Sequence, residues 1–135
     1  MTFDEMMELQ KQSKARRKPR DDEHKLQSAC VRWYRLQYPK MRHNLFSVPN
    51  GGKRDAVTAA KMKEEGALAG VADLILLKSN RFYGALLLEL KTSKGRQSDS
   101  QKEWEQKIVN DDYKYVVVRS LDEFQREVKQ YLNDI

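Results

Sequence analysis

The chain has 135 residues, 34% of them charged and 39% hydrophobic, which is enough for one domain with a buried core. Its formal charge of +6, from 26 Lys and Arg against 20 Asp and Glu, is compatible with a polyanionic partner but does not select one. No apolar run approaches the length of a membrane-spanning helix, so we expect no membrane partner. The single cysteine, Cys30, cannot form an internal disulfide, which fits a cytoplasmic, intracellular protein.

Residues 1–20 differ in composition from the rest of the chain. Their apolar residues recur at helical spacing and precede the basic run KQSKARRKPR: Phe3, Met6, Met7 and Leu9. A helix this short is marginal by itself, so the segment is either a helix that docks on the domain or on a second copy, or a solvated arm. It contains acids and lacks the apolar stretch of a secretory signal.

From residue 21 onward the hydrophobic pattern predicts a regular series of elements. In chain order these are a helix over 21–38, a strand over 44–48, a helix over 55–66, strands over 71–77 and 85–91, a helix from Ser98, a strand over 113–118 and a last helix from Leu121. The segment KSNR between the two central strands predicts a hairpin turn. A hairpin followed by a helical crossover predicts an α/β domain over 21–135, with a mixed sheet flanked by helices.

Charged residues stand at the ends of the two central strands. Glu89 and Lys91 are two positions apart at the end of an apolar strand, so their side chains point to the same face. If the strands pair as a hairpin, Asp73 at the start of one lies beside Glu89 at the end of the other. Adjacent carboxylates repel each other unless one is protonated or a cation lies between them, and Mg²⁺ prefers oxygen ligands. The spacing fits a structural ion pair as well as a metal-dependent catalytic site.

An acid followed after a gap by Glu-x-Lys is the motif of the PD-(D/E)XK nucleases, and here it is Asp73 with Glu89, Leu90 and Lys91. Nearly the whole chain past the N-terminal segment resembles the VRR-NUC family of that superfamily. The matching segments are EHKLQ, PNGG, EEGALAGVADLIL, LLLELKTSKGRQSDSQKEW, YKYVVVRS and a final helix ending in YL. One position differs, because Ala72 replaces the proline that usually precedes the acid in this family.

The resemblance implies a restriction-endonuclease-like fold, a Mg²⁺ or Mn²⁺ cofactor and a role for each matching position. The implied metal ligands are Glu23, Asp73, Glu89 and the carbonyl of Leu90, with Lys91 as the catalytic lysine and Gln101 as the glutamine of the following helix. Simpler explanations exist for two of them. Glu23 suits the first turn of a helix in any case, and Gln101 stands at capping-box spacing from Ser98.

Two basic segments that contain glycine are predicted to contact DNA phosphates. The residues are Asn50, Gly51, Gly52, Lys53 and Arg54 in the first segment, and Lys94 and Arg96 in the second. A plain turn would also explain the first segment. Neither offers an evident set of base-reading side chains, so recognition of DNA shape is favoured over recognition of sequence. Trp33 and Trp104 are predicted to be core residues rather than base-stacking platforms.

Stand-alone VRR-NUC proteins resemble Holliday-junction resolvases and commonly act as homodimers. The sequence therefore predicts a homodimeric, Mg²⁺- or Mn²⁺-dependent endodeoxyribonuclease acting on branched DNA such as Holliday junctions, without an organic cofactor. Three alternatives stay open: a non-catalytic DNA-binding module with the same fold, a flap or duplex nuclease, and a sequence-specific restriction-type nuclease. The last would usually carry a recognition region for which this chain has little room.

Overall fold

The computed structural model describes residues 2–8, 19–49 and 55–135, apart from the side chains of 19–21. Residues 3–8 are helical, and the elements that follow are α2 (Pro19–Gln37), the 3-10 helix η1 (Pro39–Asn44), β1 (Leu45–Ser47), α3 (Ala56–Glu64), β2 (Leu74–Leu76), β3 (Leu86–Leu90), α4 (Asp99–Ile108), the 3-10 helix η2 (Val109–Asp111), β4 (Lys114–Val118) and α5 (Leu121–Asn133). Each helix and strand predicted between residues 21 and 135 is present, with shifted ends.

The four strands form one mixed sheet in the order β1-β2-β3-β4. β1 pairs with β2 and β2 with β3 in antiparallel fashion, whereas β3 and β4 are parallel. The antiparallel β2–β3 pair is the predicted hairpin, and α4 lies in the crossover between β3 and β4. The α/β fold predicted from the sequence is therefore confirmed.

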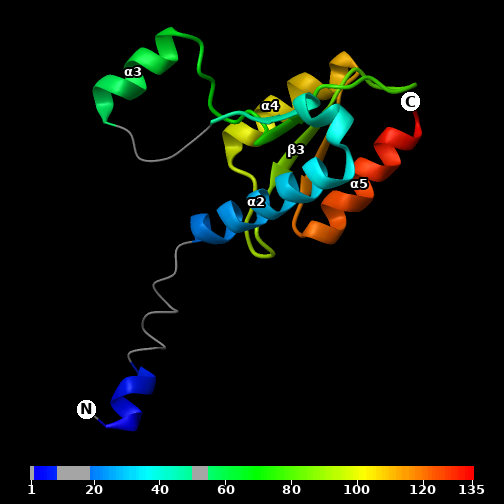
Figure 1. Cartoon of the computed structure of the whole chain (residues 1–135). Helices are drawn as coiled ribbons and strands as arrows, with labels where there is room; N and C mark the ends of the chain where they lie inside the picture. The colour runs from blue at the N-terminus through cyan, green and yellow to red at the C-terminus, as the bar shows by residue number, and fades with distance from the viewer. Residues whose placement is uncertain (1, 9–18, 50–54) are drawn as a thin grey trace.

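The sheet is covered on both faces, which explains why β3 is an almost continuous apolar run. On one face Leu86, Leu88 and Leu90 belong to a core with residues of α2 and α5. On the other face Leu87 packs with residues of α4, among them Trp104. Figure 1 shows β3 between α4 and the pair formed by α2 and α5. Because strand side chains alternate, Glu89 lies on the α4 side of the sheet.

The connection from β2 to β3 is longer than the predicted KSNR turn, because β2 ends at Leu76 and β3 begins at Leu86. Asn80 organises it. Its side-chain oxygen accepts hydrogen bonds from the backbone N–H groups of Phe82 and Tyr83, and its amide nitrogen donates to the carbonyl of Tyr131 in α5. The connection is thus held against the end of α5.

α3 is a correctly predicted helix that adds nothing to the core. The side chain of Asp55 caps it by accepting a hydrogen bond from the N–H of Thr58 at 2.7 Å, and Gly66 follows its end with a φ of 106°. None of the described residues in α3 is buried, and Figure 1 shows the helix standing apart from the sheet.

The described part of the N-terminal segment is exposed as well. Phe3, Met6 and Met7 expose 72%, 46% and 41% of their surface, so they do not dock on the domain in this single chain. Leu9 and most of the basic run lie outside the described residues. Within the described ranges, no helix is long and apolar enough to cross a membrane.

Candidate active site

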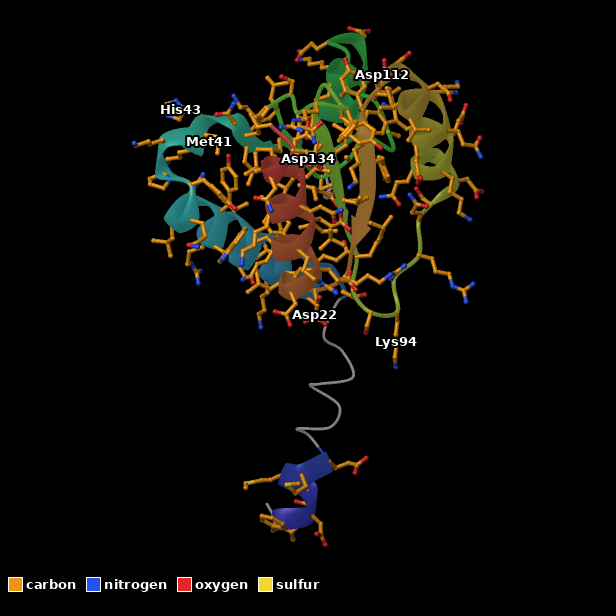
Figure 2. All side chains as sticks on the ribbon, turned by 90° about the vertical axis from the view of Figure 1, so that its right-hand side faces the viewer. Asp22, Met41, His43, Lys94, Asp112 and Asp134 are labelled. Carbon is orange, nitrogen blue, oxygen red and sulfur yellow. The ribbon has the colours of Figure 1, made fainter. Side chains whose placement is uncertain are left out.

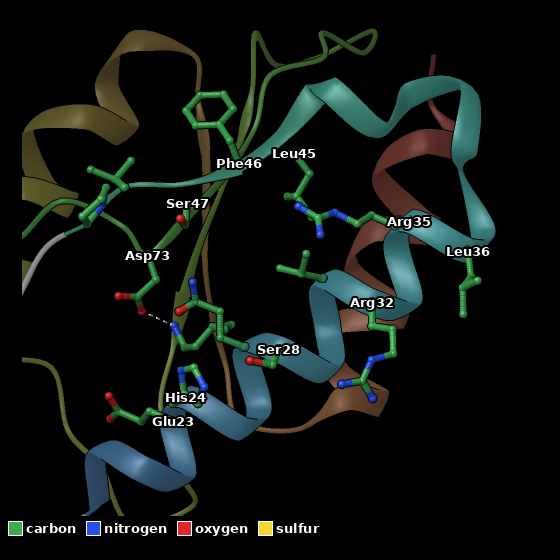
Figure 3. Close-up of a pocket in the computed structure, with 15 residues that line it drawn as sticks. Glu23, His24, Ser28, Arg32, Arg35, Leu36, Leu45, Phe46, Ser47 and Asp73 are labelled. Carbon is green, nitrogen blue, oxygen red and sulfur yellow. Dashed lines mark hydrogen bonds between the residues drawn. The ribbon is translucent and has the colours of Figure 1, made fainter.

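The strand pairing brings together the two acids that the sequence places at strand ends. Leu74 pairs with Leu88, so the preceding residue, Asp73, reaches the end of β3. There the Oδ2 atom of Asp73 accepts a hydrogen bond of 2.8 Å from the backbone N–H of Leu90 (Figure 3). This bond fixes the Asp73 carboxylate beside the Glu89–Leu90 peptide, as expected for a hairpin.

Among the residues that the structure describes, Glu89 is the one charged residue that is buried. Its side chain has no exposed surface. Its Oε1 atom accepts a hydrogen bond of 2.8 Å from Gln101 Nε2, and its Oε2 atom accepts one of 2.9 Å from the hydroxyl of Tyr115. Burial, and then the neighbouring Asp73 carboxyl group, raise the pKa of Glu89 to about 8. The two acids are thus close enough for one to govern the protonation of the other.

Glu23 and Lys91 lie in the electrostatic surroundings of this pair. Burial raises the pKa of Glu23, the positive charge of Lys91 lowers it, and the negative charge of Asp73 raises it. Glu23 comes from the start of α2, and Figure 3 shows its carboxylate on the same side as that of Asp73. The backbone N–H of Lys91 donates to the carbonyl of Val118 at 2.9 Å, which continues the pairing of β3 with β4.

A divalent ion bound mainly by two carboxylates fits this arrangement. Within residues 2–8, 19–49 and 55–135, no three His, Cys, Asp or Glu side chains lie close enough to hold an ion together, so Glu23 does not join Asp73 and Glu89 in one ligand cluster. Mg²⁺ is usually bound by one or two carboxylates, with water and substrate phosphates completing its shell. The oxygen donors of Asp73 and Glu89 meet that requirement, and their mutual repulsion would be relieved by a cation.

Gln101 both caps α4 and contacts Glu89. Its backbone N–H donates to the Oγ atom of Ser98, and its Oε1 atom accepts from the Ser98 backbone N–H at 2.8 Å, which completes a capping box at the start of α4. The remaining amide nitrogen donates to Glu89. The cap therefore fixes the direction in which Gln101 presents its donor.

An open hollow of about 850 Å³ leads away from Glu23 and Asp73. It lies between one side of α2 and the residues of β1, and Figure 3 shows the side chains that line it. Farther along α2 the lining includes Arg32 and Arg35, both exposed. The sequence analysis did not single out these arginines, and their spacing from Glu23 gave no signal, because it turns them about 180° and 120° around the helix.

Tyr115 and Gln97 were also missed. The Nε2 atom of Gln97 donates to the Tyr115 hydroxyl at 3.2 Å and to Glu105 Oε1 at 2.9 Å. The feature that could have identified Tyr115 is the alternation of side chains along a strand. Glu89 pairs with Val117 in the parallel β3–β4 ladder, and a residue two positions before Val117 points to the same face. That reasoning requires the strand register, which the sequence does not state.

The second predicted DNA-contacting segment is held by an arginine from β4's end. Arg119 Nη1 donates to the carbonyls of Thr92 and Gly95 at 2.8 and 2.6 Å. Lys94 and Arg96 are exposed on this loop, and Figure 2 shows Lys94 pointing away from the domain. The residues of the first segment, 50–54, lie outside the described residues. Trp33 and Trp104 pack against the two cores, as predicted.

Comparison with known proteins decides the family. A sequence profile described as the VRR-NUC domain matches residues 8–122. The chain belongs to the VRR-NUC family. A solved structure described as a VRR_NUC domain protein is 25% identical, with a TM-score of 0.71, and the match covers 82% of this chain and 88% of that one. No curated protein matches. VRR-NUC domains are PD-(D/E)XK nuclease domains, so membership implies hydrolysis of phosphodiester bonds in DNA.

Proposed function

We propose that this VRR-NUC chain is a Mg²⁺- or Mn²⁺-dependent endodeoxyribonuclease, with residues 21–135 as the nuclease domain and 1–20 as a basic N-terminal arm or short helix. The observation that carries the proposal is the contact between Asp73 and Glu89 beside the positive charge of Lys91. A purely structural ion pair would need one acid and one base. Two acids placed together, one of them fully buried, are costly unless one keeps a proton, as Glu89 does in the metal-free protein, or a cation lies between them.

Different residues of the site would bind the ion, stabilise charge and orient the carboxylates. Asp73, Glu89 and the carbonyl of Leu90 would hold the ion, with Glu23 acting through the surrounding water. When bound, such an ion lowers the pKa of a water molecule and neutralises charge on a phosphoryl oxygen. Lys91 places a positive charge where negative charge develops on the phosphorus oxygens during attack. Gln101 and the N–H of Leu90 keep the two carboxylates oriented.

The hollow beside α2 would receive the sugar-phosphate backbone next to the bond that is cut. It begins at Glu23 and Asp73, and it carries the exposed guanidinium groups of Arg32 and Arg35 farther along. Arginine binds phosphate oxygens through paired hydrogen bonds. Lys94 and Arg96 would contact phosphates outside the hollow, and the same kind of contact is proposed for residues 50–54, whose position the structure does not describe.

A cleavage assay on supercoiled plasmid tests the proposed reaction. We expect nicking with Mg²⁺ or Mn²⁺ and none with EDTA. Lys91→Ala and Glu89→Gln should each lower the rate by about a hundredfold or more, while DNA binding persists, because Lys91 would stabilise the developing charge and Glu89 would hold the ion. Lys102→Ala, which removes an exposed lysine of α4, is the matched control and should cut normally.

Two results would contradict the nuclease proposal. Full activity in either active-site variant would remove the assigned roles. Tight DNA binding without any cleavage, in all metals and on all substrates, would favour a non-catalytic DNA-binding module with the same fold.

We further propose that the enzyme is a homodimer acting on branched DNA, by analogy with stand-alone members of the family. A symmetric pair of sites can cut two strands in a symmetric way. Cleavage of four-way junctions, flaps, single strands and plain duplexes of equal length should show preference for the junction. Light scattering should give twice the chain mass of 15.9 kDa. A monomer with a preference for flaps would instead support a flap nuclease.

A further inference from the structure

We propose that Tyr115 is a positioning residue of this site, which holds the carboxylate of Glu89 in the orientation that binds the divalent ion. The inference rests on the proposed function, because it takes Glu89 as a metal ligand. Tyr115 comes from β4, the strand next to Glu89 in the sheet, and its hydroxyl lies 2.9 Å from Glu89 Oε2.

The direction of the Tyr115 proton follows from its neighbours. The Nε2 atom of Gln97 lies 2.9 Å from a carboxylate oxygen of Glu105, which only accepts hydrogen bonds when ionised. The side-chain atom of Gln97 that makes this contact must therefore be its nitrogen, which donates, and not its oxygen. The same nitrogen lies 3.2 Å from the Tyr115 hydroxyl oxygen. Tyr115 must therefore accept from Gln97, and its own proton is directed to Glu89.

The other oxygen of Glu89 is fixed by the same logic. The backbone N–H of Ser98 can only donate, so it identifies the side-chain oxygen of Gln101 and leaves the Gln101 amide nitrogen facing Glu89 Oε1. Each carboxylate oxygen has two lone pairs. One donor to each oxygen therefore sets the plane of the Glu89 carboxylate and leaves capacity on both oxygens for an ion.

Tyr115 also has a packing role, and the two roles can be separated. Its ring lies 6.0 Å from that of Trp104, and it packs against the core on the α4 side. Tyr115→Phe keeps the ring and removes the hydroxyl, so the variant isolates the hydrogen bond. Burial and the nearby Glu89 charge raise the pKa of Tyr115, which keeps the hydroxyl a donor.

Calorimetric titration of the full chain with Mn²⁺, without DNA, tests the inference. Outer hydrogen-bond partners of metal ligands typically contribute ten- to a hundredfold to metal affinity, so Tyr115→Phe should weaken Mn²⁺ binding by roughly that factor. In the cleavage assay the Mn²⁺ concentration for half-maximal rate should rise by a similar factor. The rate at saturating Mn²⁺ should approach that of the wild type, which a general loss of structure would not produce.

Tyr131→Phe is the matched control. Tyr131 is also a tyrosine whose hydroxyl donates a hydrogen bond inside the domain, and it is more buried than Tyr115. Its hydroxyl donates to the carbonyl of Lys78 in the connection at the opposite end of the β2–β3 pair. Its loss should lower the melting temperature and leave Mn²⁺ affinity unchanged. A wild-type chain that binds no Mn²⁺ would overturn the proposed function itself. A wild type that binds Mn²⁺, with Tyr115→Phe binding as tightly or Tyr131→Phe losing as much affinity, would overturn the positioning role and leave the nuclease proposal standing.

Discussion

Glu89 shows how a single residue links the fold to the chemistry. It occupies a position in the central strand where every neighbour along the strand is apolar, and its side chain is fully buried. Three groups offset part of the cost of burying it: Gln101, Tyr115 and the charge of Lys91. A hydrophobic residue would be accommodated there more easily, so a demand other than stability explains the carboxylate.

The raised pKa of Glu89 predicts a pH-dependent stability in the metal-free protein. Between its ordinary value of 4.5 and about 8, folded Glu89 keeps a proton that the unfolded chain has lost. The stabilisation is therefore complete below pH 4.5 and is lost as the pH rises through about 8, with a slope of up to about 1.4 kcal/mol per pH unit. Urea denaturation in EDTA at pH 5, 6, 7 and 8 measures this.

Glu89→Gln should flatten this pH dependence, because glutamine does not titrate. Glu103→Gln changes an exposed acid of α4 and should leave the slope as in the wild type. Stability that rises from pH 5 to pH 8 in the wild type, or an unchanged slope in Glu89→Gln, would show that Glu89 is ionised in the folded state throughout this range.

At the scale of elements, the loop before β2 is held against the start of α4. Gly70 has a φ of 91°, and a Cβ atom there would lie 2.3 Å from the carbonyl oxygen of Ser100. Only glycine fits so close an approach at a positive φ. The loop leads directly to Asp73, and Ser100 precedes Gln101, so this contact joins the two elements that carry the site.

Gly70→Ala should therefore be costly, by roughly 2–4 kcal/mol of unfolding free energy, because it combines a strained φ with a backbone clash. It should also reduce cleavage by displacing Asp73. Gly66→Ala is the control, since Gly66 has a φ of 106° but nothing within 4 Å of the added atom. That variant should lose only about 1 kcal/mol. Equal losses in the two variants, measured by urea denaturation, would show that the contact with α4 is unimportant.

The sequence predicted those parts of the site that depend on local pattern and on one hairpin. The alternating strands place Asp73 next to Glu89, and Ser98 to Gln101 is a local capping motif. Tyr115 was missed because its role depends on the register of two strands separated by α4. The helix η1, which begins at Pro39, was not predicted, because a proline after a helix usually marks its end, although proline also suits the first turn of a new helix.

At the scale of the whole molecule, the location of the excess positive charge decides which face attracts DNA. Arg32 and Arg35 lie on the wall of the hollow that begins at Glu23 and Asp73. At the opposite edge of the sheet, the surface beside β4 and α5 includes acids such as Glu123 and Glu127 next to Arg126. A DNA backbone should therefore favour the face that carries the hollow over the face beside α5.

This distribution predicts which arginines set the salt dependence of DNA binding. Each phosphate contact contributes about 0.9 to the slope of log affinity against log salt for duplex DNA, so Arg32→Gln with Arg35→Gln should lower the slope by about 1.8. Arg81→Gln with Arg126→Gln removes the same charge from exposed positions outside the hollow and should change the slope little. Fluorescence anisotropy in a Lys91→Ala background, which prevents cutting, measures both pairs. Equal slopes in the two double variants would mean that overall charge attracts DNA and that the hollow beside α2 does not hold its backbone.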